Sequence, residues 1–249
     1  MIYYFSATGN TRYVANLLAK ELGEEAASIT EGSQGGGLHV LCFPVHGWRV
    51  PSIVEKFLKA HSLKKIEGSI YVVLTCGDDC GQTIKYLRKI TDGLGISIAG
   101  AFSVQMPESY VGLPFMDVDT KIKEQQKIER ARLRVPQIAK AIREGRRAVY
   151  DVHEGACAYL KSKVIGGFFH HVLITDKTFR VDPNACIGCG RCVDTCQVDN
   201  MAMSAARKPV WKHTGRCMTC LACYHTCPRH AISLNGMTKN KGQYYLPKP

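Results

Sequence analysis

Residues 186–196 read Cys186-Ile-Gly-Cys189-Gly-Arg-Cys192-Val-Asp-Thr-Cys196, and residues 217–228 read Cys217-Met-Thr-Cys220-Leu-Ala-Cys223-Tyr-His-Thr-Cys227-Pro228. Both stretches have the spacing CxxCxxCxxxC, so one arrangement of four thiols occurs twice. Two-residue gaps let a tight loop direct three thiolates and its backbone N–H groups at one small object. The fourth thiol of each run lies on the next helical turn and serves the other cluster. The repeated spacing therefore predicts two cubane [4Fe–4S] clusters.

This pattern divides the eight thiols into two crossed sets. The first cluster is expected to take Cys186, Cys189, Cys192 and Cys227, and the second Cys217, Cys220, Cys223 and Cys196. Zinc and disulfides are the alternative uses of such thiols. Structural zinc usually takes two separated CxxC pairs, which neither run fits as well. Disulfides need an oxidising compartment, and the N-terminus lacks the charged region of a signal peptide. We therefore expect a reducing, cytoplasmic location.

The cysteine-rich segment closely resembles the bacterial two-cluster ferredoxin domain. It departs from that pattern at one position, because Gln197 stands where a proline follows the first run, whereas Pro228 follows the second. The departure loosens a turn but removes no ligand.

The first thirty residues indicate an anion site. Ile2–Phe5 is a short apolar run, the loop Ser6-Ala-Thr8-Gly9-Asn10-Thr11 follows, and apolar residues then recur at helical spacing. A strand that enters a helix through such a loop directs free N–H groups and hydroxyls at one point, which suits a phosphate monoester. The alternative is an ordinary helix N-cap. Neither GxxxxGK[ST] nor GxGxxG is present, so an NTP or dinucleotide loop does not fit.

Strand–loop–helix units continue through the N-terminal half. A weak strand is expected at Ala26–Thr30, and stronger ones at Leu38–Phe43, Ser69–Leu74 and Ser97–Val104. Such repeats predict a doubly wound parallel sheet with ligands at the carboxyl ends of its strands.

Residues 1 to about 145 resemble a flavodoxin-type FMN domain, with the loop after the first strand as its phosphate loop. The resemblance implies an α/β fold with a five-stranded parallel sheet in the order 2-1-3-4-5, followed by a small α+β two-cluster ferredoxin domain. It assigns the FMN phosphate to Ser6, Thr8, Gly9, Asn10 and Thr11. It assigns the isoalloxazine ring to two further loops, which contribute Pro44, Val45, His46, Gly47, Trp48, Thr75, Cys76, Gly77, Asp78 and Gly81.

Several side chains in these loops have competing interpretations. Trp48 suits stacking on a planar ring, or packing on the helix that follows it. His46 and Arg49 either place positive charge near the ring or are solvated loop cations. Cys76 and Cys80 are interpreted as structural thiols, because CxxxC lacks a redox-motif context. Tyr110 either reaches the ring edge or covers the end of the sheet.

The formal net charge of the 249-residue chain is +12. Two oxidised clusters and a flavin phosphate lower it to about +6, which still favours an acidic redox partner.

Residues 117–147 predict a long basic helix that Pro136 kinks or divides. This helix has no interleaved aromatic residues, which argues against nucleic acid. No uninterrupted apolar run reaches about 18 residues, so no membrane span is expected. The oligomeric state is left open.

The whole chain resembles the EFR1-type flavodoxin–ferredoxin fusion proteins. We expect a flavodoxin-like domain at 1–147, a packed linker at 148–177, a 2[4Fe–4S] ferredoxin domain at 178–237 and a tail at 238–249. The predicted function is electron transfer between FMN, the two clusters and an external redox protein. The alternatives are a flavin-dependent reductase of a small molecule, and a redox sensor that uses the basic helix. No catalytic acid–base pair is apparent, so oxidoreductase and simple electron carrier both stay open.

Overall fold

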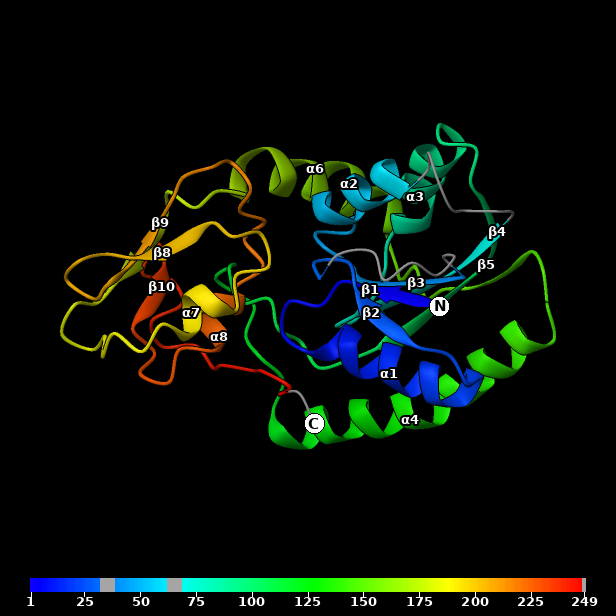
Figure 1. Cartoon of the computed structure of the whole chain (residues 1–249), viewed down its shortest axis with the longest axis horizontal. Helices are drawn as coiled ribbons and strands as arrows, with labels where there is room; N and C mark the ends of the chain where they lie inside the picture. Colours follow the sequence, from blue (N-terminus) through cyan, green and yellow to red (C-terminus); the bar gives the residue numbers. More distant parts are fainter. Residues whose placement is uncertain (32–38, 62–68, 248–249) are drawn as a thin grey trace.

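A computed structural model describes residues 1–31, 39–61 and 69–247. Leu38, where we expected one strand to begin, and the last two residues of the tail lie outside this range. Figure 1 shows a large sheet-and-helix half and a smaller half that contains the cysteine runs.

The larger half contains a parallel sheet in the order β2-β1-β3-β4-β5-β6. The predicted order 2-1-3-4-5 is confirmed, but the expectation of five strands was wrong, because a sixth strand extends the sheet beside β5. Its three residues were assigned to the linker, since so short an edge strand leaves no periodic pattern in the sequence. The strands are β1 (Ile2–Tyr4), β2 (Ala26–Ser28), β3 (Val40–Pro44), β4 (Ser69–Cys76), β5 (Ser97–Gln105) and β6 (Val149–Asp151).

Helices cover both faces of this sheet (Figure 1). On one face α1 (Asn10–Leu22) and α4 (Lys121–Arg143) bury Leu18 and Ile138 with strand residues such as Val73. On the other, α2 (Ser52–His61) and α3 (Thr83–Asp92) bury residues such as Leu87. Pro136 lies inside α4 and does not divide it. No described helix is both long and apolar enough to cross a bilayer.

The smaller half is built around the two cysteine runs. It contains two antiparallel strand pairs and two helices of four residues, and its core includes Phe179, Leu221 and Tyr224. Each helix follows a cysteine-containing turn and carries the third cysteine of its run. The elements are β7 (Phe179–Val181), α7 (Arg191–Asp194), β8 (Met201–Met203), β9 (Pro209–Trp211), α8 (Ala222–His225) and β10 (Ile232–Leu234).

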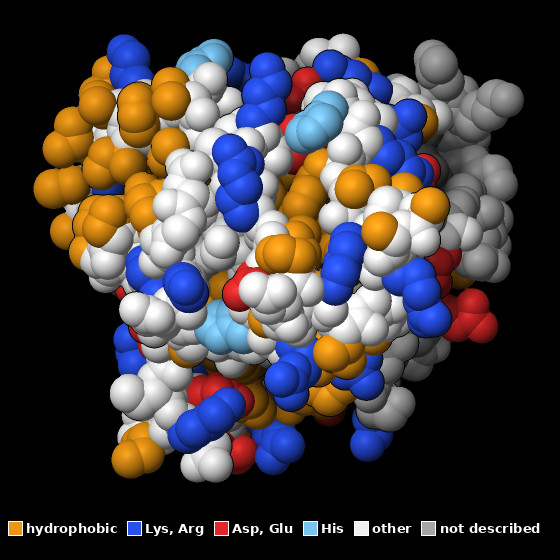
Figure 2. Space-filling model, turned by 90° about the vertical axis from the view of Figure 1, so that its left-hand side faces the viewer, with side chains coloured by type: hydrophobic (Ala, Val, Ile, Leu, Met, Phe, Trp, Pro, Cys, Tyr) orange, Lys and Arg blue, Asp and Glu red, His pale blue; other side chains and the backbone are white. Residues whose placement is uncertain are grey.

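A helical segment of alternating α and π turns connects the two halves. It comprises α5 (Ala158–Leu160), η1 (Lys161–Ile165), α6 (Gly166–Phe168) and η2 (Phe169–Leu173). Phe169 is buried, with its ring against those of His46 and Tyr110. Six large apolar side chains point outward instead: Tyr159, Leu160, Val164, Ile165, Phe168 and Val172. In Figure 2, which shows one face of the molecule, a hydrophobic patch lies at the upper left. The segment therefore packs between the halves with only part of its apolar surface.

The C-terminal tail returns from the smaller half to the start of α1 (Figure 1). The Gln243 amide donates to the Tyr224 carbonyl. The Tyr244 hydroxyl donates to Asn10 Oδ1 at 2.6 Å, and the Leu246 N–H donates to the Thr8 carbonyl at 2.8 Å. The tail is thus an ordered connection between the cysteine half and the predicted phosphate loop.

We expect Tyr244→Phe to lower the free energy of unfolding by about 1–3 kcal/mol, because it leaves a buried amide oxygen of Asn10 without that donor. Guanidinium unfolding of the anaerobically purified protein measures this. Tyr159→Phe is the matched control. Its exposed hydroxyl accepts only from Lys163, so the change should stay within about 0.5 kcal/mol. Equal effects of the two substitutions would contradict a structural role for the tail.

Candidate cofactor sites

The structure brings the eight cysteines together in the two crossed sets expected from their spacing. One small cavity, of about 20 Å³, is lined by Cys186, Cys189, Cys192 and Cys227. A second, of about 30 Å³, is lined by Cys196, Cys217, Cys220 and Cys223. We call these the first and second thiol cavities. In the part of the chain that the structure describes, no group of three or more His, Cys, Asp or Glu side chains has the arrangement of a site for one metal ion.

Matched backbone conformations shape the two loops. Gly188 and Gly190 have φ of 68° and 78°, in the left-handed region that glycine adopts readily. The equivalent residues of the second loop, Thr219 and Leu221, have φ of 52° and 59° without being glycine. Left-handed backbone costs about 1–2 kcal/mol per ordinary residue. This conformational cost is offset here by side-chain interactions, since Thr219 Oγ1 donates to the Leu173 carbonyl at 3.2 Å and Leu221 is buried.

The environment of the thiols favours binding to a cation. Burial raises the pKa of Cys220 to about 12 and that of Cys192 to about 11. Such thiols become thiolates only when a positive partner such as iron replaces the proton. Backbone N–H groups already point at three sulfurs: Asn200 donates to Cys196 Sγ at 3.3 Å, Thr219 to Cys217 Sγ at 3.4 Å, and Ala231 to Cys227 Sγ at 3.2 Å. The donor set therefore fits iron–sulfur clusters.

Gln197, the departure from the ferredoxin pattern, has a contact of its own. Its Oε1 accepts a hydrogen bond at 3.0 Å from the Thr30 hydroxyl, beyond β2 in the other half. A proline at this position would lack the amide, so the glutamine adds a link between the halves.

A third cavity lies at the carboxyl ends of β1, β3, β4 and β5. We call it the strand-end cavity; its volume is about 90 Å³. Ten predicted flavin residues line it: Ser6, Thr8, Asn10, Thr11, Pro44, Val45, His46, Thr75, Cys76 and Gly77. Met218 and Cys220, from the second cysteine run, line the same cavity. The fold thus places the predicted phosphate loop and a predicted cluster ligand on one enclosed space.

The phosphate loop retains unused hydrogen-bond donors. The Ser6 hydroxyl is buried and has no hydrogen-bond partner in the described structure. The first backbone bond of α1 runs from Tyr13 N–H to Gly9, so the preceding amides of the helix have no helical acceptor. A phosphate monoester matches these donors. The cavity is smaller than the roughly 300 Å³ of a typical ligand pocket, so a flavin ring requires the surrounding segments to move apart.

Gly9 has no room for a side chain. Its φ is 100°, and an added Cβ would collide with the Leu246 carbonyl of the tail. Arg12 Nη2 also donates to that carbonyl, at 2.6 Å. The tail therefore closes one side of the phosphate loop, a contact that the polar tail sequence did not indicate.

The remaining predicted ring-loop residues do not line the strand-end cavity. Trp48 Nε1 donates to Asp79 Oδ1 at 2.8 Å, and its side chain lies against Gly81. Gly47 faces the Phe169 ring. Asp78 lies 3.7 Å from Lys127 Nζ. Trp48 thus packs within its own loops, and the structure gives no stacking position for it over this cavity.

Other side chains take places that sequence reasoning missed. Glu108 lines the cavity and accepts the N–H groups of Ser109 and Tyr110, while burial raises its pKa. Met106, directly after β5, is also buried there. Their only signal in the sequence was their position at the end of a predicted strand. Tyr110 lines the cavity, as one of its two interpretations required.

The structure also shows the surroundings of Cys76, Cys80 and Arg49. Cys76 lines the cavity, Cys80 is fully buried, and a hydrogen bond with Cys80, followed by burial, raises the pKa of Cys76. The Cys76 thiol is therefore protonated at neutral pH. Arg49 lies over the Tyr86 ring, 4.7 Å from its centre, and is absent from the cavity lining.

Comparison with known proteins assigns a family to the cysteine-rich segment. The family model of the 4Fe-4S dicluster domain matches residues 178–228. Among solved structures, the Trp repressor binding protein from Bacillus subtilis matches 53% of this chain and 96% of its own, with 13% identity and a TM-score of 0.36. Rubredoxin oxygen:oxidoreductase from the anaerobe Desulfovibrio gigas matches 57% of this chain and 36% of its own, with 17% identity and a TM-score of 0.30. The comparison with curated proteins found no match.

The fold of the N-terminal half and the family match of the C-terminal half together define the class of protein. The N-terminal half is a flavodoxin-like α/β domain by its strand order. The C-terminal half is a ferredoxin-type domain of the 4Fe-4S dicluster kind, whose general role is iron–sulfur electron transfer.

His46 in the strand-end cavity gives a pH-dependent prediction. Burial, and to a smaller extent the neighbouring His170, lowers its pKa to about 3. Between pH 6.5 and about 3 the unfolded chain holds a proton that the folded ring does not, so stability falls as pH falls. The loss should reach about 2 kcal/mol at pH 5. Guanidinium unfolding at pH 7.5 and 5.0 measures it. His46→Gln should reduce the pH dependence by this amount, whereas His171→Gln, at an exposed site, should leave it unchanged. A full pH dependence in His46→Gln would contradict the assignment.

Proposed function

We propose that this chain is an iron–sulfur flavoprotein that transfers electrons between FMN, two [4Fe–4S] clusters and an external redox protein. The observation that carries the proposal is the strand-end cavity, since residues of the phosphate loop and Cys220 line it together. A flavin bound there would contact the second thiol cavity through Met218 and Cys220. The arrangement corresponds to the EFR1-type fusion that the sequence resembles.

The eight cysteines would hold the clusters in their crossed sets: Cys186, Cys189, Cys192 and Cys227 the first, and Cys196, Cys217, Cys220 and Cys223 the second. The crossing is supported by the linings of the two thiol cavities. Because each set takes its fourth thiol from the other run, the two clusters would share loops and lie close together.

For FMN, the phosphate would take the Ser6 hydroxyl and the free amides at the start of α1. FMN exchanges electrons in pairs or singly, whereas each cluster exchanges one. His46, neutral and with its Nε2 buried without a partner, would offer a hydrogen bond to the ring without adding charge. Displacement of the tail or of the segment 106–110 would admit the ring.

The external partner would dock at the first cluster. Cys189 is exposed, and the adjacent Ile187 is 62% exposed, whereas Cys220 faces the interior cavity. The basic side chains of Arg207 and Arg229 are exposed in the same half of the molecule. An acidic partner with an apolar contact point suits this surface. The path would run from FMN through the second cluster and the first cluster to that partner.

Iron, sulfide and flavin quantitation of the anaerobically purified protein is the first test, and two four-iron clusters and one FMN per chain are expected. Zinc in place of inorganic sulfide, or no bound flavin, would contradict the proposal.

The order of the path is tested by rapid mixing of reduced protein with oxidised rubredoxin, a small acidic one-electron protein. Cys189→Ser should slow flavin oxidation at least about tenfold, because it removes a ligand of the exit cluster. Cys157→Ser, which alters an exposed thiol outside both thiol cavities, is the control and should react as the wild type. An unchanged rate in Cys189→Ser with the first cluster lost would show that electrons leave by another route.

A further inference from the structure

A large cavity, lined by many polar and charged residues, separates the two halves on the side of β1 and β2. We call it the interdomain cavity; its volume is about 1070 Å³, at the upper end of the range for small-molecule sites. One wall comes from the ends of β1 and β2 and the start of α2, and the other from the cysteine loops. The strand-end cavity shares only Ser6 with it.

Cations without carboxylate partners line this cavity. Arg12, Lys56, Arg191 and Arg216 form no ion pair within the described residues. Three carboxylates also line it, those of Glu31, Asp194 and Asp199, and that of Asp199 is bonded to Lys212 at 2.6 Å. The local balance is therefore positive.

Arg12 is the most informative of these cations. Its side chain is nearly buried, with 9% exposure, yet its one hydrogen bond in the described structure goes to the Leu246 carbonyl. A guanidinium has five N–H donors, and a buried charge without a counterion is unfavourable. An anion beside Arg12 would satisfy its remaining donors and supply the missing counterion.

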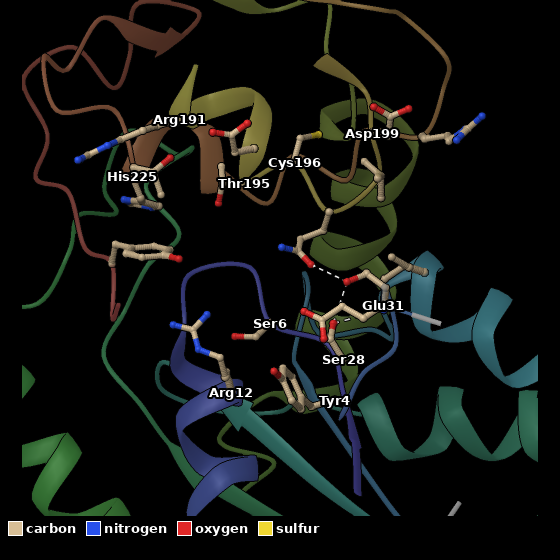
Figure 3. A pocket seen from close by; sticks show the side chains of 18 of the residues that line it. Tyr4, Ser6, Arg12, Ser28, Glu31, Arg191, Thr195, Cys196, Asp199 and His225 are labelled. Atoms are coloured by element: carbon tan, nitrogen blue, oxygen red, sulfur yellow. Dashed lines mark hydrogen bonds between the residues drawn. The ribbon is translucent and has the colours of Figure 1, made fainter. Parts of the chain in front are cut away.

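Figure 3 shows the geometry of these groups. The Arg12 guanidinium and the Ser6 and Tyr4 hydroxyls extend into the space from the strand-end side, and the Thr195 side chain extends toward it from the cysteine loops. Cys196 and Cys227, one from each thiol cavity, belong to the opposite wall. The space therefore offers charge for an acidic group, hydroxyls for polar substituents, and proximity to both predicted clusters.

We propose that the interdomain cavity binds a small organic anion, with its phosphate or carboxylate group on Arg12 and its polar substituents among the surrounding hydroxyls. This site is separate from the strand-end cavity and does not require flavin to be bound there. Arg216, on the opposite wall, contributes long-range attraction and a contact at the other end of the ligand.

The test is calorimetric titration of the anaerobically prepared, FMN-saturated protein with inorganic pyrophosphate and with citrate. Binding of either anion is expected, and the tighter of the two identifies the acidic group. Arg12→Gln should weaken binding at least tenfold, since a charge-assisted contact of this kind is lost. Arg12→Lys should retain part of the affinity, because charge remains without the planar fork.

Arg147→Gln is the matched control, because Arg147 is an exposed arginine in the same half as Arg12 and does not line the cavity; its affinity should stay within about twofold of the wild type. If Arg12→Gln does not fold, Arg216→Gln carries the test and should weaken binding severalfold. The proposal is overturned if the wild type binds neither anion at 10 mM, or if folded Arg12→Gln or Arg216→Gln binds as the wild type does. Flavin absorbance of each variant is read separately, so failure of the proposed FMN site is distinguishable from failure of this one.

Discussion

The structure of the smaller half depends on one constraint. Each of its two cysteine loops contributes its fourth thiol to the quartet of the other loop. Cys196 leaves the first run and joins the second thiol cavity, and Cys227 makes the reverse exchange. Neither quartet can assemble unless both loops and both short helices are in place. In a half with three-residue strands and four-residue helices, hydrophobic burial alone is limited. Cluster binding would then supply much of the folding free energy, as metals do in other small domains.

The second constraint is the contact between the halves. It includes the Thr30–Gln197 hydrogen bond, the Phe169 ring beside His46, and the tail on Thr8. These contacts come from three separate parts of the chain. They hold Met218 and Cys220 against the strand-end cavity, which is the geometry that the proposed electron transfer needs. The same packing leaves the strand-end cavity small and the interdomain cavity large, so the two spaces suit different roles.

Much of this arrangement was predictable because the chemistry fixes residue spacing. Metal ligation demands thiols at set intervals, so the crossed quartets follow from Cys186 to Cys227 alone, and the strand–loop–helix repeat gives the order of the first five strands. Side-chain direction within a loop is not encoded in this way. Trp48 suits a flavin ring by residue type, but Asp79 accepts its indole N–H and turns it elsewhere. Strand β6, the tail contact on Gly9 and the left-handed backbone at Leu221 depend on tertiary partners that no local pattern reveals.

The central claim is that the eight thiols hold two inorganic clusters in crossed sets beside the strand-end cavity. An iron-edge anomalous difference map from anaerobically grown crystals tests it most directly. The account predicts two compact multi-iron peaks, one enclosed by Cys186, Cys189, Cys192 and Cys227 and the other by Cys196, Cys217, Cys220 and Cys223, with the second nearer the phosphate loop. Single-ion peaks, or clusters each bound by the four cysteines of one run, would contradict it.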